Sequence, residues 1–98
     1  MAIVRGFQWD ARKNDLNLLK HGIDFDEAIE VFYAPHLLRP ADHPTEERWL
    51  AVGDVDGRTI TVIFTWRDGD IRVISARRAR KDEKRTYRQK ILGRPPEG

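Results

Sequence analysis

The stretch from Arg58 to Trp66 limits the possible folds more than any other part of this 98-residue chain. Every second side chain in it is large and apolar: Ile60, Val62, Phe64 and Trp66. Such alternation is typical of a β-strand with one buried face. Asp-Gly pairs at 56–57 and 68–69 bound the stretch, and each is a strong signal for a hairpin turn. The sequence therefore predicts an antiparallel meander with strands at residues 48–55, 58–66 and 71–76.

Two helices are predicted before these strands. The first follows a short extended or strand segment at residues 7–9 and spans residues 11–20. Its ends are marked by an N-cap and a left-handed C-cap residue, Asp10 and Gly22. Leu16 and Leu19 lie three residues apart, so we expect them to form the narrow apolar stripe of this helix.

The second helix begins at Asp24 and Glu27, which have the spacing of a capping box. Apolar residues then recur at helical spacing: Phe25, Ala28, Ile29 and Phe32. Pro35 ends this helix. Residues 34–47 contain three prolines, and we expect them to form a loop of about 14 residues.

The end of the chain is strongly basic. Residues 75–98 contain nine Lys or Arg but only three Asp or Glu. We expect the strand at 71–76 to run directly into a basic helix, which Tyr87 and Ile91 dock on the sheet, and residues 93–98 to form a frayed tail. Clustered Arg and Lys on an ordered helix suit the binding of phosphate or carboxylate groups. A charge run is also often no more than a solvated surface.

The order of these elements predicts one α+β domain with two N-terminal helices, an antiparallel sheet of three to four strands and a C-terminal basic helix. An apolar content of 40% fits a globular fold. The absence of Cys excludes disulfides and thiolate metal sites. No apolar run approaches the roughly 18 residues of a membrane span, and the first residues lack a signal-peptide core. We therefore expect a cytoplasmic location.

Several kinds of active site are excluded by the sequence. It contains no glycine-rich phosphate loop, and Ser75 lacks the G-x-S-x-G setting of a hydrolase nucleophile. Four possible metal ligands fall within six residues: Asp42, His43, Glu46 and Glu47. Their spacing matches no zinc pattern and Pro44 interrupts it, so we expect neither a metal nor another cofactor.

Cleavage of RNA without a metal is the remaining chemistry that the polar residues suit. It requires removal of a proton from the 2′-hydroxyl, stabilisation of charge on the phosphate and protonation of the 5′-oxygen. The residues available for these steps are Lys20, His21, Glu46, Glu47, Arg48, Arg77, Arg78 and Tyr87. Each also has a structural interpretation, with His21 as a helix cap, the arginines as surface ion pairs and Tyr87 as a docking residue.

Several short motifs occur in the order found in one known family. They are F-Q-W-D at 7–10, K-H-G at 20–22, F-D-E-A at 25–28, E-R at 47–48 and S-A-R-R-A at 75–79. Further matches are Lys13, Asn17, Val31-Phe32, Glu83-Lys84-Arg85 and Tyr87. In this combination, from about residue 7 to residue 88, the chain resembles the BrnT family. One departure is Arg80, which stands where the family often has a Thr or Ser helix cap.

The resemblance implies a ribonuclease toxin of a bacterial type II toxin–antitoxin module, with a fold similar to RelE toxins. Such a toxin cleaves RNA without a metal and arrests growth. The resemblance further implies a BrnA-type antitoxin that binds the toxin and carries a DNA-binding domain. The complex of the two would bind operator DNA and repress its own operon.

The resemblance also selects the site residues. The implied catalytic set is Lys20, His21, Glu47, Arg48, Arg77, Arg78 and Tyr87. Within it, Arg77 and Arg78 are assigned to the phosphate, and His21 and Glu47 are the candidates for general acid and base. Lys20 would hold the RNA backbone or lower the pKa of a neighbour. The implied RNA-binding set on the basic helix is Arg80, Lys81, Lys84, Arg85 and Arg88.

Two other interpretations stay open. The basic helix fits a non-catalytic module that binds the phosphates of a nucleic acid without cleaving it. It also fits a protein-interaction domain whose basic face binds an acidic partner. Degradation of a labelled RNA by the pure protein in excess EDTA would separate the ribonuclease from both.

Overall fold

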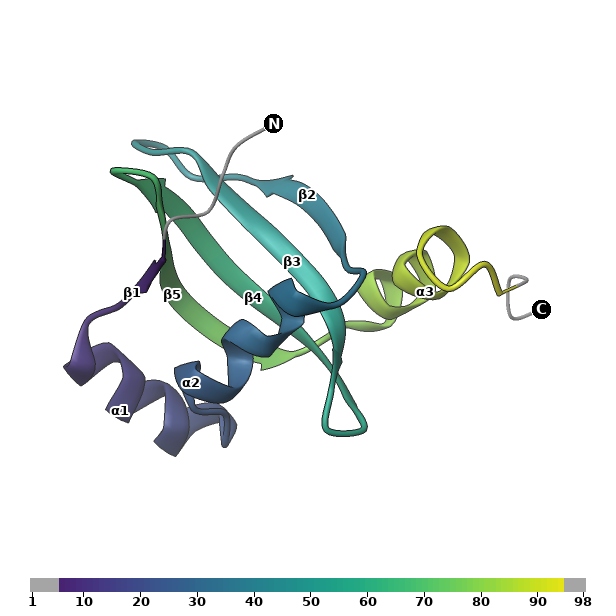
Figure 1. Cartoon of the computed structure of the whole chain (residues 1–98), viewed down its shortest axis with the longest axis horizontal. Coiled ribbons are helices and arrows are strands. Elements are labelled where there is room, and N and C mark those ends of the chain that lie inside the picture. Colours follow the sequence, from purple (N-terminus) through teal and green to yellow (C-terminus); the bar gives the residue numbers. More distant parts are fainter. Residues whose placement is uncertain (1–5, 95–98) are drawn as a thin grey trace.

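Five strands form one mixed sheet in the computed structural model, which describes residues 6–94 (Figure 1). The strands, in the spatial order β1-β5-β4-β3-β2, are β1 (Phe7–Gln8), β5 (Asp70–Arg78), β4 (Arg58–Arg67), β3 (Arg48–Val55) and β2 (Leu37–Ala41). The helical segments are α1 (Ala11–His21), α2 (Phe25–Ala28), the 3-10 helix η1 (Ile29–Tyr33) and α3 (Lys81–Lys90). The predicted α+β class is therefore confirmed.

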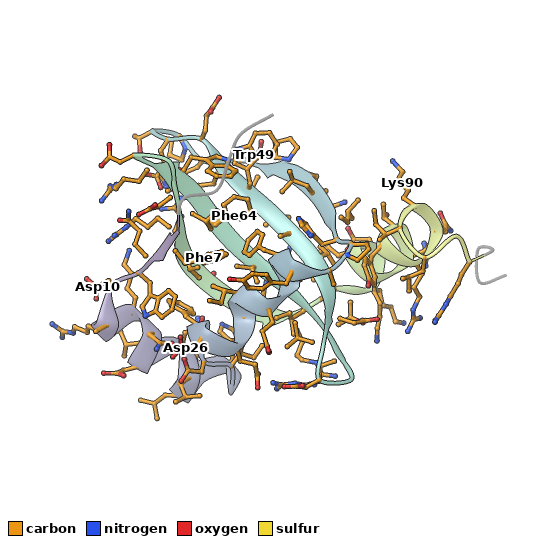
Figure 2. The ribbon with its side chains drawn as sticks, in the orientation of Figure 1. Phe7, Asp10, Asp26, Trp49, Phe64 and Lys90 are labelled. Carbon is orange, nitrogen blue, oxygen red and sulfur yellow. The ribbon has the colours of Figure 1, made fainter. Side chains whose placement is uncertain are left out.

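The central meander β3-β4-β5 is antiparallel and follows the predicted turns. Asp56 and Gly57 both have positive φ, 50° and 76°, as the tight hairpin turn between β3 and β4 requires. The alternating stretch of β4 buries Ile60, Val62 and Phe64 completely or nearly so. Figure 2 shows Phe64 on the face of the sheet that the helical segment crosses, and its ring centroid lies 5.1 Å from that of Phe32 in η1.

The prediction of a long loop at residues 34–47 is wrong, because β2 lies within it. Leu37–Ala41 pairs antiparallel with β3, from Leu37 opposite Val52 to Ala41 opposite Arg48. Pro40 belongs to this strand, and β2 is the edge of the sheet. An edge strand tolerates proline because half of its N–H groups point away from the sheet. Within this range only residues 34–36 and 42–47 lie outside helices and strands.

The prediction of three to four antiparallel strands is also wrong. Besides β2, the sheet gains β1, which pairs parallel with β5 through Phe7 opposite Ile71 and Gln8 opposite Arg72. β1 has only two residues, too few for any periodic pattern. Tertiary packing holds it, since the ring of Phe7 lies 5.6 Å from that of Phe32 between centroids.

The second N-terminal helix is shorter and tighter than expected. α2 is a single turn that continues as the 3-10 helix η1. Asp24 caps it by accepting from the Asp26 N–H at 3.0 Å, whereas Glu27 forms an ion pair with Arg58 instead of closing the capping box. Gly53 lets η1 approach β3, because a Cβ at this position would lie 2.6 Å from Val31 Cγ2.

Asn17, rather than a leucine, is the buried residue of α1. Its amide donates to the Ala76 carbonyl at 2.9 Å, and its Oδ1 accepts from the Ala76 N–H at 3.1 Å. The side chain therefore pairs with β5 as a neighbouring strand would. The amide also donates to the Ile23 carbonyl at 2.9 Å. Leu16 and Leu19 are 58% and 85% exposed, so the predicted apolar stripe is wrong.

The sheet has helices on both faces (Figure 1). The main core lies on the face that α2 and η1 cover, and includes Phe25, Val31 and the inward residues of β4. α3 packs on the opposite face, where Tyr87 meets Leu37 and Val52, with Ile91 beside them. The predicted docking by Tyr87 and Ile91 is thus confirmed. β5 runs to Arg78 and α3 begins at Lys81, later than expected, and the end of the predicted tail, residues 95–98, lies outside the described residues.

The role of Asn17 can be tested by replacing it with alanine. Asn17→Ala leaves a buried N–H and two buried carbonyls without their partner, so we expect the free energy of unfolding to fall by about 2–4 kcal/mol. Leu19→Ala on the exposed side of the same helix should change it by less than about 0.5 kcal/mol. Urea denaturation followed by tryptophan fluorescence measures both. Equal stabilities of the two variants would contradict the strand-like role of Asn17.

Candidate functional site

The face of the sheet on which α3 packs is only partly covered. One row of paired residues crosses it from Leu37 through Val52 and Thr61 to Arg77, and the first three are buried near α3. The next row is only partly covered and consists of Arg39, Leu50, Ile63 and Ser75. We call the surface around this second row the open face.

Arg77 lies at the border between the open face and α3. Its Nη1 donates to Glu83 Oε1 at 2.8 Å and its Nη2 to Oε2 at 2.9 Å, a two-pronged ion pair. Oε1 also accepts from Thr61 Oγ1 at 2.9 Å and from the Arg80 N–H at 2.8 Å. The side chain of Glu83 is 2% exposed and that of Arg77 19%. This one carboxylate therefore joins β4, β5 and the first turn of α3.

Charge complementarity keeps the Glu83–Arg77 pair ionised. Burial opposes ionisation of Glu83, but hydrogen bonds from Arg77, the Arg80 N–H and Thr61 outweigh it and lower the pKa of Glu83 from 4.5 to about 2. The hydrogen bonds to Glu83 in turn raise the pKa of Arg77. Arg39 on β2 adds a second cation, with its Nη2 3.8 Å from Glu83 Oε2.

Lys20 and His21 lie beside the same strand. With Lys13 and Asn17 of α1 they line a shallow hollow of about 250 Å³, whose other wall is formed by Ile74 and Ser75 of β5. Ser75 precedes Arg77 by two residues, so their side chains lie on the same face of β5, roughly 7 Å apart along the strand. The structure therefore brings Lys20, His21 and Arg77 to one stretch of β5.

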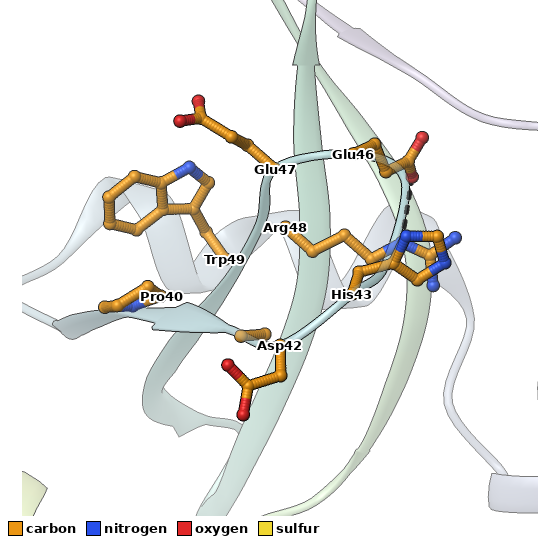
Figure 3. Close-up of a pocket in the computed structure, with 8 residues that line it drawn as sticks. Pro40, Asp42, His43, Glu46, Glu47, Arg48 and Trp49 are labelled. Carbon is orange, nitrogen blue, oxygen red and sulfur yellow. Dashed lines mark hydrogen bonds and ion pairs between the residues drawn. The ribbon is translucent and has the colours of Figure 1, made fainter.

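Glu47 and Arg48 lie at another place on the sheet. They help line a polar pocket of about 310 Å³ at the loop between β2 and β3 (Figure 3). Arg48 Nε donates to Glu46 Oε1 at 2.8 Å, and this hydrogen bond lowers the pKa of Glu46. Glu47 is exposed, and its carboxylate points away from this ion pair (Figure 3).

The seven predicted catalytic residues do not share one centre. Thr65 Oγ1 donates to the Glu47 carbonyl and Thr65 pairs with Arg72, so Glu47 and Arg48 lie near the level of Arg72. Arg77 is five residues further along β5, roughly 16 Å away along the strand. A single phosphate group cannot contact both ends.

Arg78 and Tyr87 also differ from Arg77 in position. Arg78 pairs with Ile60, whose side chain lies in the main core, so alternation places Arg78 on the face opposite to Arg77. Tyr87 lies on the side of α3 that faces the sheet and is 4% exposed. Burial and the nearby Asp54 carboxylate raise the pKa of Tyr87.

The cations of α3 form a stripe that lies mostly on the side of the helix turned away from the sheet. Glu83 and Tyr87 are its buried residues, four apart, and define the side that faces the sheet. By the 3.6-residue period one other side carries four cations, which we call the α3 stripe: Lys81, Lys84, Arg85 and Arg88. Arg80 precedes the helix as its N-cap residue and is exposed.

Sequence reasoning missed two members of this site. Glu83 was part of a motif but received no role, although an acid at the third position of a helix is a signal for reaching back to the N-cap N–H. Arg39 carries no sequence signal for the site, because the three prolines of residues 34–47 favour a loop over the strand β2. In residues 6–94 no three His, Asp or Glu side chains gather as metal ligands would. Within the same range, every helix is too short or too polar to cross a membrane.

Comparison with known proteins identifies relatives. The family described as "Ribonuclease toxin, BrnT, of type II toxin-antitoxin system" matches residues 9–83. Among solved structures, the crystal structure of the Brucella abortus ribonuclease toxin BrnT is similar, with a TM-score of 0.61 and 30% sequence identity. That match covers 78% of this chain and 97% of the other. No curated protein sequence matches the chain.

The buried carboxylate predicts a pH dependence of stability. The pKa of Glu83 is lowered on folding, so its charged interactions contribute fully above about pH 5 and are lost as the pH falls from 4.5 towards 2. Glu83→Gln cannot titrate. We expect the difference in unfolding free energy between wild type and Glu83→Gln to be largest above pH 5 and to shrink towards pH 2, by up to about 1.4 kcal/mol per pH unit. Urea denaturation at several pH values measures it, and a difference independent of pH would refute it.

Proposed function

Because the chain belongs to the BrnT family of ribonuclease toxins of type II toxin–antitoxin systems, we propose that it is a metal-independent endoribonuclease whose cleavage site lies along β5. The main support for this location is the hollow lined by Lys20, His21 and Ser75. Arg77 follows Ser75 by two residues on the same strand. A proton-transfer group, a lysine and a partly covered sheet surface line this hollow, and the cation of Arg77 lies further along the same strand. These are the groups that cleavage of an RNA phosphodiester requires.

His21 and Arg77 have different roles in the proposed reaction. A base removes the proton of the ribose 2′-hydroxyl, the 2′-oxygen bonds to phosphorus, and the bond from phosphorus to the 5′-oxygen breaks as that oxygen gains a proton. His21 is the acid–base group beside β5, so it takes the proton of the 2′-hydroxyl and can return a proton to the 5′-oxygen. Arg77 stabilises the charge on the phosphate oxygens, and Lys20 holds the neighbouring backbone.

Arg77 keeps donors for a phosphate despite its ion pair. A guanidinium has five N–H groups in a fixed plane. Three have acceptors, because Nη1 donates to Glu83 and to the Arg78 carbonyl at 3.3 Å, and Nη2 donates once to Glu83. The Nε–H and the second Nη2 hydrogen have no acceptor among residues 6–94. They lie along one edge of the plane and match two phosphate oxygens.

Of the two acid–base candidates, His21 carries out the proton steps. Glu47 lies too far from Arg77 to act on the same phosphate, so Glu47 and Arg48 would contact nucleotides away from the cleaved bond. Tyr87 docks α3 and Arg78 faces the other side of the sheet, so neither is assigned a chemical step. Arg80 and the α3 stripe would bind phosphates further along the RNA.

The proposal includes an antitoxin partner. The family implies one, and we propose a BrnA-type protein that covers the open face and the α3 stripe and competes with RNA. An acidic segment would suit these cations, because it neutralises the charges that RNA uses. The DNA-binding part of that partner would carry the complex to operator DNA. The toxin itself would act on RNA in the cytoplasm.

Substitution at the site tests the cleavage mechanism. We expect Arg77→Ala and His21→Ala each to slow cleavage of a labelled RNA by about 10²–10³-fold, the usual cost of losing a transition-state donor or a proton-transfer group. Arg77→Lys should recover little activity, because a lysine keeps the charge but not the planar fork. The assay contains excess EDTA, and cleavage by the wild type should be unaffected by it.

Arg67→Ala serves as the matched control, since it removes an exposed arginine at the far end of β4. It should cleave at the wild-type rate. Circular dichroism confirms that each variant is folded. Undiminished cleavage by folded Arg77→Ala would place the active site elsewhere, and binding of RNA without any cleavage by the wild type would favour the non-catalytic module.

Salt dependence tests the role of the α3 stripe. Replacing Lys81, Lys84 and Arg85 together by Gln should weaken RNA binding and lower the slope of log affinity against log salt by about 2, since each phosphate contact to single-stranded RNA contributes roughly 0.7. Fluorescence anisotropy of a labelled RNA between low and moderate salt measures the slope. An unchanged slope would show that the stripe does not contact phosphates.

A further inference from the structure

We infer that Glu83 is a positioning residue for RNA cleavage, one that sets the plane and direction in which the Arg77 guanidinium meets the scissile phosphate. The inference rests on the proposed function, because it takes Arg77 as the phosphate-binding group. Glu83 itself is 2% exposed, so it acts through Arg77 and does not contact RNA.

The geometry shows how Glu83 fixes Arg77. Both carboxylate oxygens bind Arg77, at 2.8 Å and 2.9 Å, and occupy the Nη1–Nη2 edge of its plane. The carboxylate is itself held by Thr61 Oγ1 and the Arg80 N–H, so it cannot rotate with the arginine. An arginine side chain alone has many rotamers, and ordering it costs up to about 2 kcal/mol of entropy. Here folding has ordered it before RNA arrives, and the Nε–Nη2 edge points in one direction.

Charge gives this role a distinct signature. A carboxylate beside Arg77 lowers the positive potential of the site, so Glu83 cannot improve RNA binding by electrostatic attraction. Its benefit is orientation, which matters at the transition state and little for binding elsewhere along the RNA. Replacing Glu83 by Gln removes its charge but keeps its shape, so this change should lower kcat while KM stays the same or falls. A purely structural role would not separate the two constants in this way.

The test compares steady-state cleavage of a labelled RNA by full-length wild type, Glu83→Gln, Arg77→Ala and the double variant, well below the melting temperature of each. We expect Glu83→Gln to lower kcat by about 10–100-fold without raising KM. In the Arg77→Ala background the same change should have no further effect, because the residue through which it acts is gone. Glu30→Gln, the same charge change at an exposed glutamate of η1 on the other face of the sheet, should leave kcat unchanged.

The outcomes separate this inference from the function on which it rests. A wild-type kcat in Glu83→Gln would overturn the role of Glu83, and so would a double variant whose loss in kcat is the product of the two single losses. In either case, reduced cleavage by Arg77→Ala would still support the proposed function. Full activity of Arg77→Ala, or no cleavage by the wild type, would overturn both. If Glu83→Gln does not fold, Glu83→Asp replaces it, because the charge is kept but the shorter side chain cannot hold both nitrogens of Arg77. Its kcat should then fall with KM unchanged, and a wild-type kcat would overturn the inference.

Discussion

The buried carboxylate of Glu83 is the interaction on which the functional half of this protein depends. It accepts hydrogen bonds from β4, from β5 and from the first turn of α3, so it determines where the chain leaves the sheet and turns back over it. A charge that is 2% exposed is costly unless it is paired and hydrogen-bonded, and here the ion pair with Arg77 and hydrogen bonds from Thr61 and the Arg80 N–H compensate it. The position of α3 on the sheet follows from this carboxylate and from the apolar contacts of Tyr87.

The placement of α3 divides one face of the sheet into two parts. Under the helix the row that ends at Arg77 is buried, and beside it the row that ends at Ser75 is only partly covered. The border between the two parts is where Arg77 stands, with one edge of its guanidinium bound and the other available. The same turn of chain directs the α3 stripe to one side of the helix. The proposed ribonuclease site is therefore a product of how α3 docks on the sheet.

The errors in the sequence predictions have identifiable physical causes. Pro40 favours a loop when the sequence is considered alone, yet an edge strand does not need the N–H that proline lacks. The spacing of Leu16 and Leu19 predicts an apolar packing face for α1, but β1 pairs with β5 only at Ile71 and Arg72. The edge of Ala76 that faces away from β4 therefore has no strand partner, and Asn17 faces the sheet to fill it. Its amide can donate and accept at once, which no apolar side chain can do.

The sequence by itself determined the α+β class, the three-stranded meander with its two Asp-Gly turns, the docking of the last helix and the family. These rest on local periodicity, on turn residues and on short motifs, which are properties of neighbouring residues. Tertiary structure alone decided that Lys20 and His21 lie against the same strand as Arg77, that Glu47 and Arg48 lie roughly 16 Å from Arg77 along it, and that Glu83 links three elements. Such contacts depend on strand order and register, and these are set by packing between residues that are distant in the chain.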